Sequence, residues 1–190
     1  MSAPKKKKIV FICTGNTCRS PMAEKLLDRA LKEQKLGGFT ITSAGTKAKR
    51  GDTINPKSQA VLEENGICVQ EFKSKKITPA TLRDAFAIVC MTESHRDYLM
   101  DMRWSVLRKA GVEEIENNVY SFAELTGTDV LDPFGKDMDC YRYVYALLAT
   151  GMPKVIDGLR LREYAILPKK RGRKKKTGIS DEQSSAENKE

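Results

Sequence analysis

The sequence predicts an α/β protein, a single domain built on a parallel sheet of about four strands with helices on both faces. Short apolar runs alternate along the chain with longer segments in which apolar residues recur at helical spacing. Two runs, residues 9–12 and 85–91, are almost continuously apolar, as is typical of parallel strands buried on both faces. The length of 190 residues, 40% of them hydrophobic, suffices for one core.

The first strand is predicted over residues 9–12, where four apolar residues follow one another. A turn separates it from a helix over residues 21–34, for which Ser20 is the expected N-cap and Pro21 the first helical position. Residues 39–43 alternate in polarity, which predicts a second strand.

The middle of the chain predicts two helices, over residues 56–65 and 79–84, each opened by a proline. The apolar run at residues 85–91 follows as a central strand, and residues 93–102 as a further helix. The stretch after residue 102 is ambiguous, and Trp104 within it is expected to be a packing residue.

The last strand is predicted at residues 119–121. Residues 131–135 contain Pro and Gly and predict a loop, and residues 136–150 predict a helix. Pro153 is expected to open a final helix that ends near Tyr164.

The net charge of +9 is concentrated at the two ends of the chain. The sequence therefore predicts a solvated basic lead-in (1–8), a folded body (9–167) of nearly neutral charge, and a basic, disordered tail (168–190). The tail includes a dense basic block at residues 169–176, for which acidic surfaces, RNA or lipid are the expected partners. Basicity confined to the ends argues against a nucleic-acid-binding domain.

The chain shows neither a secretion signal nor an apolar stretch of membrane-spanning length. Its five cysteines form no disulfide-framework or metal-knuckle spacing, which favours a reduced, cytoplasmic protein. His95 is the only histidine, and we expect it at the surface or in packing rather than in a metal site. No cofactor or metal is expected. The cysteines are Cys13, Cys18, Cys68, Cys90 and Cys140.

The turn after the first strand has the features of an anion-binding cradle. Backbone N–H groups of a short Gly-containing turn, followed by a helix N-terminus, attract negative charge. Cys13 begins this turn and Arg19 ends it. A helix N-terminus and a nearby cation favour the nucleophilic thiolate form of cysteine, and the Arg fork matches two phosphate oxygens. We therefore expect Cys13 to be the nucleophile and Arg19 to bind the phosphoryl group.

The residues between and just after these two are expected to bind phosphate oxygens. Phosphoryl transfer needs charge stabilisation at three equatorial oxygens, and turn N–H groups supply it. Ser20 has a second possible role, a hydrogen bond from its hydroxyl to the thiolate. The phosphate-binding set is Thr14, Gly15, Asn16, Thr17, Cys18 and Ser20.

The run from Cys13 to Pro21, Cys-Thr-Gly-Asn-Thr-Cys-Arg-Ser-Pro, resembles the active-site loop of low-molecular-weight protein tyrosine phosphatases. Further matches spread from Lys8 to about Leu161. The resemblance implies hydrolysis through a phosphocysteine intermediate without a metal. It also implies that Asn16 braces the loop through Ser43.

The Asp132-Pro133 pair resembles the acid loop of the same family. This implies that Asp132 protonates the leaving group and then activates water, although Asp-Pro alone is also a common turn starter. Phe134 would line the pocket wall. Many relatives have an aromatic pair there, whereas this chain has Gly135 in the second position.

Thr14 follows the nucleophile where many tyrosine phosphatases of the family have a larger apolar residue. The bacterial protein arginine phosphatases share this Thr. Phosphotyrosine and phosphoarginine both remain candidate substrates, and Asp132 is suited to pair with a guanidinium.

Two other functions fit parts of the pattern. An arsenate reductase has a similar loop but needs a close pair of later cysteines, whereas Cys68, Cys90 and Cys140 are far apart in sequence. A non-catalytic phosphoprotein-binding module would need only the cradle. Within the loop, Cys13 and Cys18 are close enough for a protective disulfide, and simple packing of Cys18 is the equal alternative.

Overall fold

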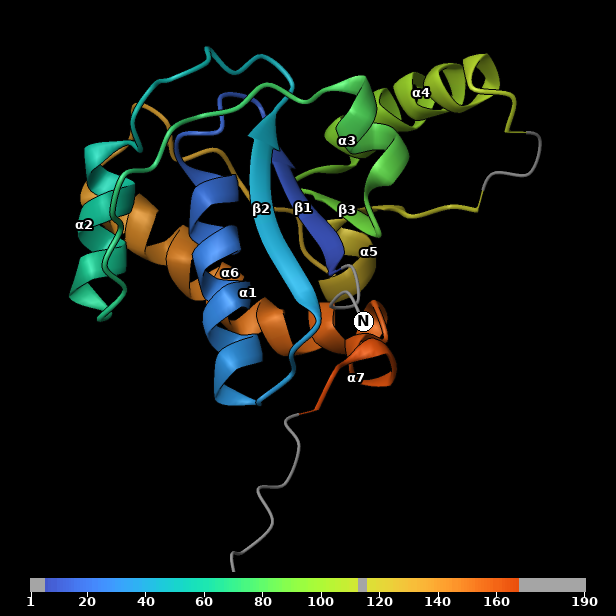
Figure 1. Cartoon of the computed structure of the whole chain (residues 1–190). Coiled ribbons are helices and arrows are strands. Elements are labelled where there is room, and N and C mark those ends of the chain that lie inside the picture. Colours follow the sequence, from blue (N-terminus) through green and yellow to red (C-terminus); the bar gives the residue numbers. More distant parts are fainter. Residues whose placement is uncertain (1–5, 113–115, 168–190) are drawn as a thin grey trace, which may run out of the picture.

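The computed structural model describes residues 6–112 and 116–167, and it contains a four-stranded sheet whose strands are all parallel (Figure 1). The strand order is β2-β1-β3-β4. The predicted fold class is therefore confirmed. The strands are β1 (Lys7–Cys13), β2 (Phe39–Gly45), β3 (Ala87–Cys90) and β4 (Val119–Ser121).

Helices cover both faces of the sheet. On one face α1 (Arg19–Glu33) packs against β1 and β2, and α6 (Met138–Gly158) packs against α1. On the other face α3 (Pro79–Asp84) and α4 (Glu93–Lys109) pack together, as Figure 1 shows. Three shorter helices complete the domain: α2 (Pro56–Glu64), α5 (Phe122–Thr126) and α7 (Leu161–Tyr164).

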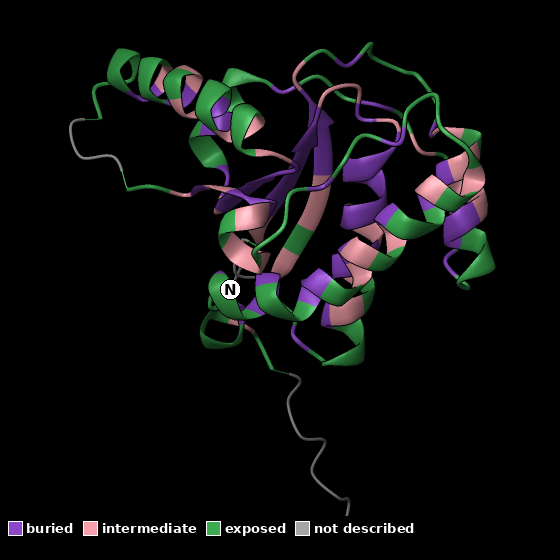
Figure 2. Ribbon diagram, turned by 180° about the vertical axis from the view of Figure 1, so that it is seen from behind, coloured by how far each residue is buried: buried purple, intermediate pink, exposed green. Residues whose placement is uncertain are grey.

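The strands in the middle of the sheet are buried on both sides (Figure 2). In β1, Ile9 and Phe11 join the core beneath α1 and α6, whereas Val10 and Ile12 join the core beneath α4. This alternation explains the continuous apolar run in the sequence, because each face of a central parallel strand needs its own apolar residues.

The basic lead-in is shorter than predicted. β1 begins at Lys7, so Lys7 and Lys8 belong to the sheet rather than to a solvated segment. The Lys7 ammonium lies 5.0 Å from the ring centroids of both Phe86 and Tyr164. Cation–π contacts of this kind hold a Lys side chain on the surface of the fold instead of in bulk water.

The expected helix cap at Ser20 is wrong. α1 begins at Arg19, its N-cap residue is Cys18, and no side chain forms a capping hydrogen bond there. Ser20 therefore lies inside the first turn, which turns its hydroxyl toward the loop instead of toward the helix end.

α4 is longer than predicted and includes most of the ambiguous stretch. Arg103 explains the extension, because its buried guanidinium donates to the carbonyls of Leu82 and Glu116 and ties the second half of the helix to the domain. Trp104, predicted to be a packing residue, is not part of the core but packs at the surface. Its side chain is 40% exposed and contacts the Arg108 guanidinium, 5.4 Å from the ring.

Pro153 does not open a helix; it lies inside α6, which runs without interruption to Gly158. Proline lacks an N–H group and costs about 3 kcal/mol in a helix interior, so packing must hold the helix together there. Met152, Val155 and Ile156 are buried on either side of it. Tertiary contacts thus outweigh the tendency of Pro153 to interrupt a helix.

The predicted tail, residues 168–190 with its basic block, lies outside the described residues. Within the described part of the chain, no helix is long and apolar enough to cross a membrane.

Leu27 tests the α1–sheet core, because its side chain is completely buried. We expect Leu27→Ala to lower the free energy of unfolding by about 2–5 kcal/mol, since the change removes buried methyl groups and leaves a cavity. Chemical denaturation measures the effect. The exposed variant Lys32→Ala on the same helix serves as control and should change stability by less than about 0.5 kcal/mol. Equal effects of the two variants would contradict the assignment of this face to the core.

Candidate active site

The loop between β1 and α1 forms a closed turn at the carboxyl end of the sheet. Cys13 ends the strand and Arg19 begins the helix. Between them Asn16 has a positive φ of 54°. Among residues with a side chain, Asn tolerates this left-handed conformation best, so its position mid-turn has a physical reason.

The Asn16 side chain is buried and ties the loop to three other segments. Its Nδ2 donates to Ser20 Oγ (3.0 Å) in α1 and to Ser43 Oγ (2.9 Å) in β2. Its Oδ1 accepts the backbone N–H of Lys75 at 2.8 Å. Ser43 Oγ in turn donates to Glu24 at 2.6 Å. Every polar atom of this amide therefore has a partner, which fixes the curvature of the loop.

Gly45, the last residue of β2, allows the loop to pack directly on the strand. A Cβ at this position would lie 2.5 Å from the Thr14 carbonyl oxygen and 2.9 Å from the Asn16 backbone nitrogen. No side chain fits at such distances without moving the loop backbone. The close approach lets the Thr46 and Lys47 N–H groups donate to the carbonyls of Cys13 and Thr14.

Cys13 Sγ is surrounded by hydrogen-bond partners suited to a thiolate. The side chain is only 3% exposed. Ser20 Oγ lies 3.0 Å from the sulfur, and the Asn16 backbone N–H donates to it at 3.3 Å. Together these contacts hold the sulfur in one orientation beside the N-terminus of α1.

Arg19 is held at the opposite side of the loop by two hydrogen bonds. Nη1 donates to the Val130 carbonyl (3.1 Å) and Nη2 to Asp132 Oδ2 (2.6 Å). The Arg19 side chain is 5% exposed, whereas that of Asp132 is 51% exposed. A buried guanidinium thus faces a carboxylate that has access to water.

These groups surround one cavity of about 230 Å³. Phe134 stands at its rim, with 70% of the residue exposed. Asn16, Ser20 and Ser43 do not line the cavity but lie buried behind the loop. The structure thus gathers the remaining candidate residues in one place: Cys13, Thr14, Gly15, Thr17, Cys18, Arg19, Asp132 and Phe134.

Cys18 lies in the same cavity but in a different environment from Cys13. Its sulfur contacts the hydroxyls of Thr17 and Tyr141, each at 3.7 Å. Burial raises the pKa of the Cys18 thiol, which keeps it protonated and weakly nucleophilic. Both cysteines are free thiols in this structure. Cys68, Cys90 and Cys140 lie on separate elements: after α2, in β3 and in α6.

His95 is a site residue that the sequence did not reveal. Its Nε2 lies 3.0 Å from Thr14 Oγ1 and its Nδ1 lies 2.6 Å from Thr92 Oγ1. Burial, followed by the charge of Arg19, lowers the pKa of this imidazole. The helix that carries it follows β3, which neighbours β1, so its first turn meets the loop at the same edge of the sheet. This contact could have been inferred from the strand order, but no sequence motif indicates it.

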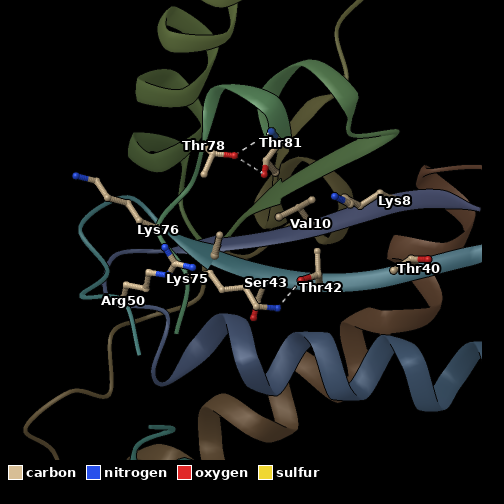
Figure 3. Close-up of a pocket in the computed structure, with 11 residues that line it drawn as sticks. Lys8, Val10, Thr40, Thr42, Ser43, Arg50, Lys75, Lys76, Thr78 and Thr81 are labelled. Atoms are coloured by element: carbon tan, nitrogen blue, oxygen red, sulfur yellow. Dashed lines mark hydrogen bonds between the residues drawn. The ribbon is translucent and has the colours of Figure 1, made fainter. Parts of the chain in front are cut away.

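A larger cavity of about 540 Å³ lies over β1 and β2 (Figure 3). Lys8, Arg50, Lys75 and Lys76 contribute to its walls together with several threonines, but neither a cysteine nor a carboxylate does. It therefore lacks a nucleophile and an acid. Among the residues with described positions, no group of three or more His, Cys, Asp or Glu side chains is arranged to hold a metal ion.

Comparison with known proteins agrees with this geometry. Residues 8–164 match the family described as low molecular weight phosphotyrosine protein phosphatase. The chain is 30% identical over 152 residues to the probable low molecular weight protein-tyrosine-phosphatase AmsI of Erwinia amylovora, covering 80% of this chain and 96% of that protein. It is also 30% identical over 153 residues to the protein-arginine-phosphatase of Geobacillus stearothermophilus, with the same coverage of 80% and 96%.

Solved structures give the same result. The YwlE arginine phosphatase from Geobacillus stearothermophilus superposes with a TM-score of 0.68 at 28% identity, covering 83% of this chain and 96% of that one. The Erwinia amylovora tyrosine phosphatase AmsI superposes with a TM-score of 0.67 at 27% identity, covering 80% and 93%.

Gly45 offers a test of how the loop is held. We expect Gly45→Ala to displace the loop, because the added Cβ would meet backbone atoms that cannot rotate away. Phosphate binding, measured by calorimetry, should weaken at least about 10-fold, which corresponds to about 1.4 kcal/mol. Thr42→Ala, three residues earlier on the same strand, is the matched control. Unaltered phosphate affinity in Gly45→Ala would contradict the role given to this contact.

Proposed function

Because the chain belongs to the low molecular weight phosphotyrosine protein phosphatase family, we propose that it removes phosphate from proteins through a covalent phosphocysteine on Cys13. The chain is accordingly a protein phosphatase. The observation that supports the proposed mechanism is the convergence of a nucleophile, a cation and a carboxylic acid on one cavity: Cys13, Arg19 and Asp132. A binding module would need the loop and its cation, but neither a nucleophile nor an acid.

In the first proposed step the Cys13 thiolate attacks phosphorus, an S–P bond forms, and the bond from phosphorus to the leaving oxygen or nitrogen breaks. Asp132, in its protonated form, gives its proton to the leaving atom. In the second step Asp132 takes a proton from water, which attacks the phosphocysteine and releases inorganic phosphate. Hydrolysis therefore restores both residues without a metal or an oxidant.

Arg19 would change partners when substrate binds. In this structure its Nη2 group donates to Asp132. A phosphoryl group in the cavity would compete for the same guanidinium, because Arg binds phosphate oxygens through parallel N–H donors. This competition would free Asp132 for proton transfer, while the Val130 carbonyl continues to hold Nη1.

The substrate that the site fits best is phosphoarginine. Thr14 directly follows the nucleophile and lines the cavity, and the half-exposed Asp132 carboxyl group is suited to pair with a guanidinium. Two relatives, from Geobacillus stearothermophilus and Bacillus subtilis, bear the name protein-arginine-phosphatase. Phosphotyrosine is the second candidate, because Phe134 offers an exposed aromatic face at the rim.

We assign the catalytic domain to residues 7–167, because β1 begins at Lys7, and treat residues 168–190 as a separate basic tail that contacts acidic surfaces, RNA or lipid. Five free thiols favour a reducing, cytoplasmic location. The phosphorylated substrate would then be an intracellular protein.

The nucleophile can be tested with matched phosphoarginine and phosphotyrosine peptides in EDTA. We expect phosphate release from phosphoarginine to exceed that from phosphotyrosine, and Cys13→Ala to lower kcat at least about 1,000-fold on both. Cys68→Ala, which removes an exposed cysteine, is the control and should keep full activity. Release that persists in Cys13→Ala would rule out the covalent mechanism.

The acid can be tested in the same assay. Asp132→Asn should lower kcat by about 100- to 10,000-fold, because an amide cannot donate a carboxyl proton to the leaving group. Asp129→Asn, an exposed carboxylate on the same segment, should retain activity. If the two variants lost activity equally, general electrostatics rather than proton transfer would explain the effect.

A further inference from the structure

Thr14 stands between two cavities. It lines the catalytic pocket of about 230 Å³, and it also lines an adjoining recess of about 300 Å³. On the side of the recess its hydroxyl meets the His95 imidazole at 3.0 Å. The recess is lined by Thr14, Thr46, Lys47, Ser94, His95 and Tyr98.

The His95 ring is fixed through both of its nitrogens. Nδ1 lies 2.6 Å from Thr92 Oγ1, while Nε2 contacts Thr14. Thr92 is the N-cap of α4, and its Oγ1 also accepts the backbone N–H of His95. A ring bound at both nitrogens cannot flip without losing two hydrogen bonds, so it holds the Thr14 hydroxyl in one orientation.

The surroundings of the imidazole favour its neutral form. Burial and the Arg19 charge lower its pKa, while Asp132 and Asp129 act in the opposite direction. Lys47 and Tyr98 complete the polar surroundings in the recess. A neutral imidazole donates through one nitrogen and accepts through the other, so the Thr14 contact has a definite direction.

Two features determine that direction. The Arg19 guanidinium and the N-terminus of α1 lie at the catalytic pocket, and a hydroxyl dipole near such positive charge turns its oxygen toward the pocket and its hydrogen away. At the other end of the ring, Thr92 Oγ1 lies 2.9 Å from Ser94 Oγ, which can accept its hydrogen. Thr92 is then free to accept from Nδ1–H.

We propose that His95 is a positioning residue that accepts the Thr14 hydroxyl proton, so that Thr14 Oγ1 faces the catalytic pocket as a hydrogen-bond acceptor and selects substrates whose leaving group carries N–H donors. A phosphorylated guanidinium has such donors next to the scissile bond, whereas a phenolic ring has none. The inference rests on the proposed function and names the residue that sets its substrate preference.

The tautomer can be observed directly, because His95 is the only histidine in the chain. A long-range 1H–15N NMR spectrum of the uniformly labelled full-length protein contains one imidazole spin system. We expect Nδ1 to be protonated and Nε2 to be unprotonated near neutral pH, and the Nε2 shift to change in Thr14→Val. A protonated Nε2 would overturn the assignment without any measurement of activity.

Selectivity gives a second, independent test. The quantity is the kcat/KM for a phosphoarginine peptide divided by that for a matched phosphotyrosine peptide. We expect Thr14→Val and His95→Leu each to lower this ratio about 10-fold, the loss of one hydrogen bond to a charged group. The double variant should lower it no further, because the two residues act through one contact. His95→Gln, whose amide oxygen can accept from Thr14, should restore part of the ratio.

A pH profile separates positioning from simple packing. Protonation of His95 places a hydrogen on Nε2, reverses the bond to Thr14 and removes the acceptor from the pocket. As the pH drops below the ordinary histidine pKa of about 6.5, the wild-type ratio should therefore fall more steeply than the ratios of Thr14→Val and His95→Leu. Titration of the substrates' own phosphoryl groups at about pH 6 affects all three proteins alike. Tyr98→Phe, which alters the recess but not the contact, should follow the wild-type profile.

The results separate an error in the role of His95 from an error in the proposed function. If wild type prefers phosphoarginine but His95→Leu keeps the wild-type ratio, the role of His95 is wrong and the proposed function stands. Additive losses in the double variant would also overturn the coupling. If wild type prefers phosphotyrosine, the proposed substrate fails, and the selection by Thr14 fails with it.

Discussion

The left-handed turn at Asn16 is the constraint on which the site depends. A loop of seven residues, 13–19, must curve tightly enough for its N–H groups to converge, and the Asn16 amide maintains that curvature through Ser20, Ser43 and the Lys75 backbone. Gly45 also maintains the position of the loop, because a Cβ at this residue would displace the loop from β2. The loop is therefore shaped by buried contacts behind the cavity, and these contacts fix the positions of Cys13 and Arg19 without any ligand.

The parallel sheet then brings distant segments to this loop. Strands β1 and β3 are neighbours, so the loop after β1 meets the first turn of α4, which carries His95. The Val130–Asp132 segment reaches the opposite rim and holds Arg19 through a carbonyl and a carboxylate. Functional groups meet at the carboxyl edge, as in other α/β sheets, because that is where the loops after adjacent strands lie side by side.

The sequence was sufficient where the signal is local. A few adjacent residues predict each of three features: the Cys13–Arg19 loop, the short helix α3 that begins at Pro79, and the strand β3, which is buried on both faces. The sequence was insufficient where tertiary contacts determine the local structure. Pro153 is tolerated within α6 because its neighbours are buried. Lys7 pairs with Phe39 in the sheet, and its ammonium group lies against two aromatic rings. His95 could not be linked to Thr14 by pattern, since 81 residues separate them and only strand order brings them together.

The central claim is that Cys13 carries the phosphoryl group during turnover, and trapping that species tests it most directly. When wild-type enzyme is mixed with excess phosphopeptide and denatured within milliseconds, part of the protein should be trapped as the phosphorylated intermediate, because formation and hydrolysis of the S–P bond are separate steps. Mass spectrometry of the peptide that contains Cys13 is expected to show one added phosphate, absent from Cys13→Ala. Phosphate on another residue, or none at any time during turnover, would contradict the account and require direct attack by water.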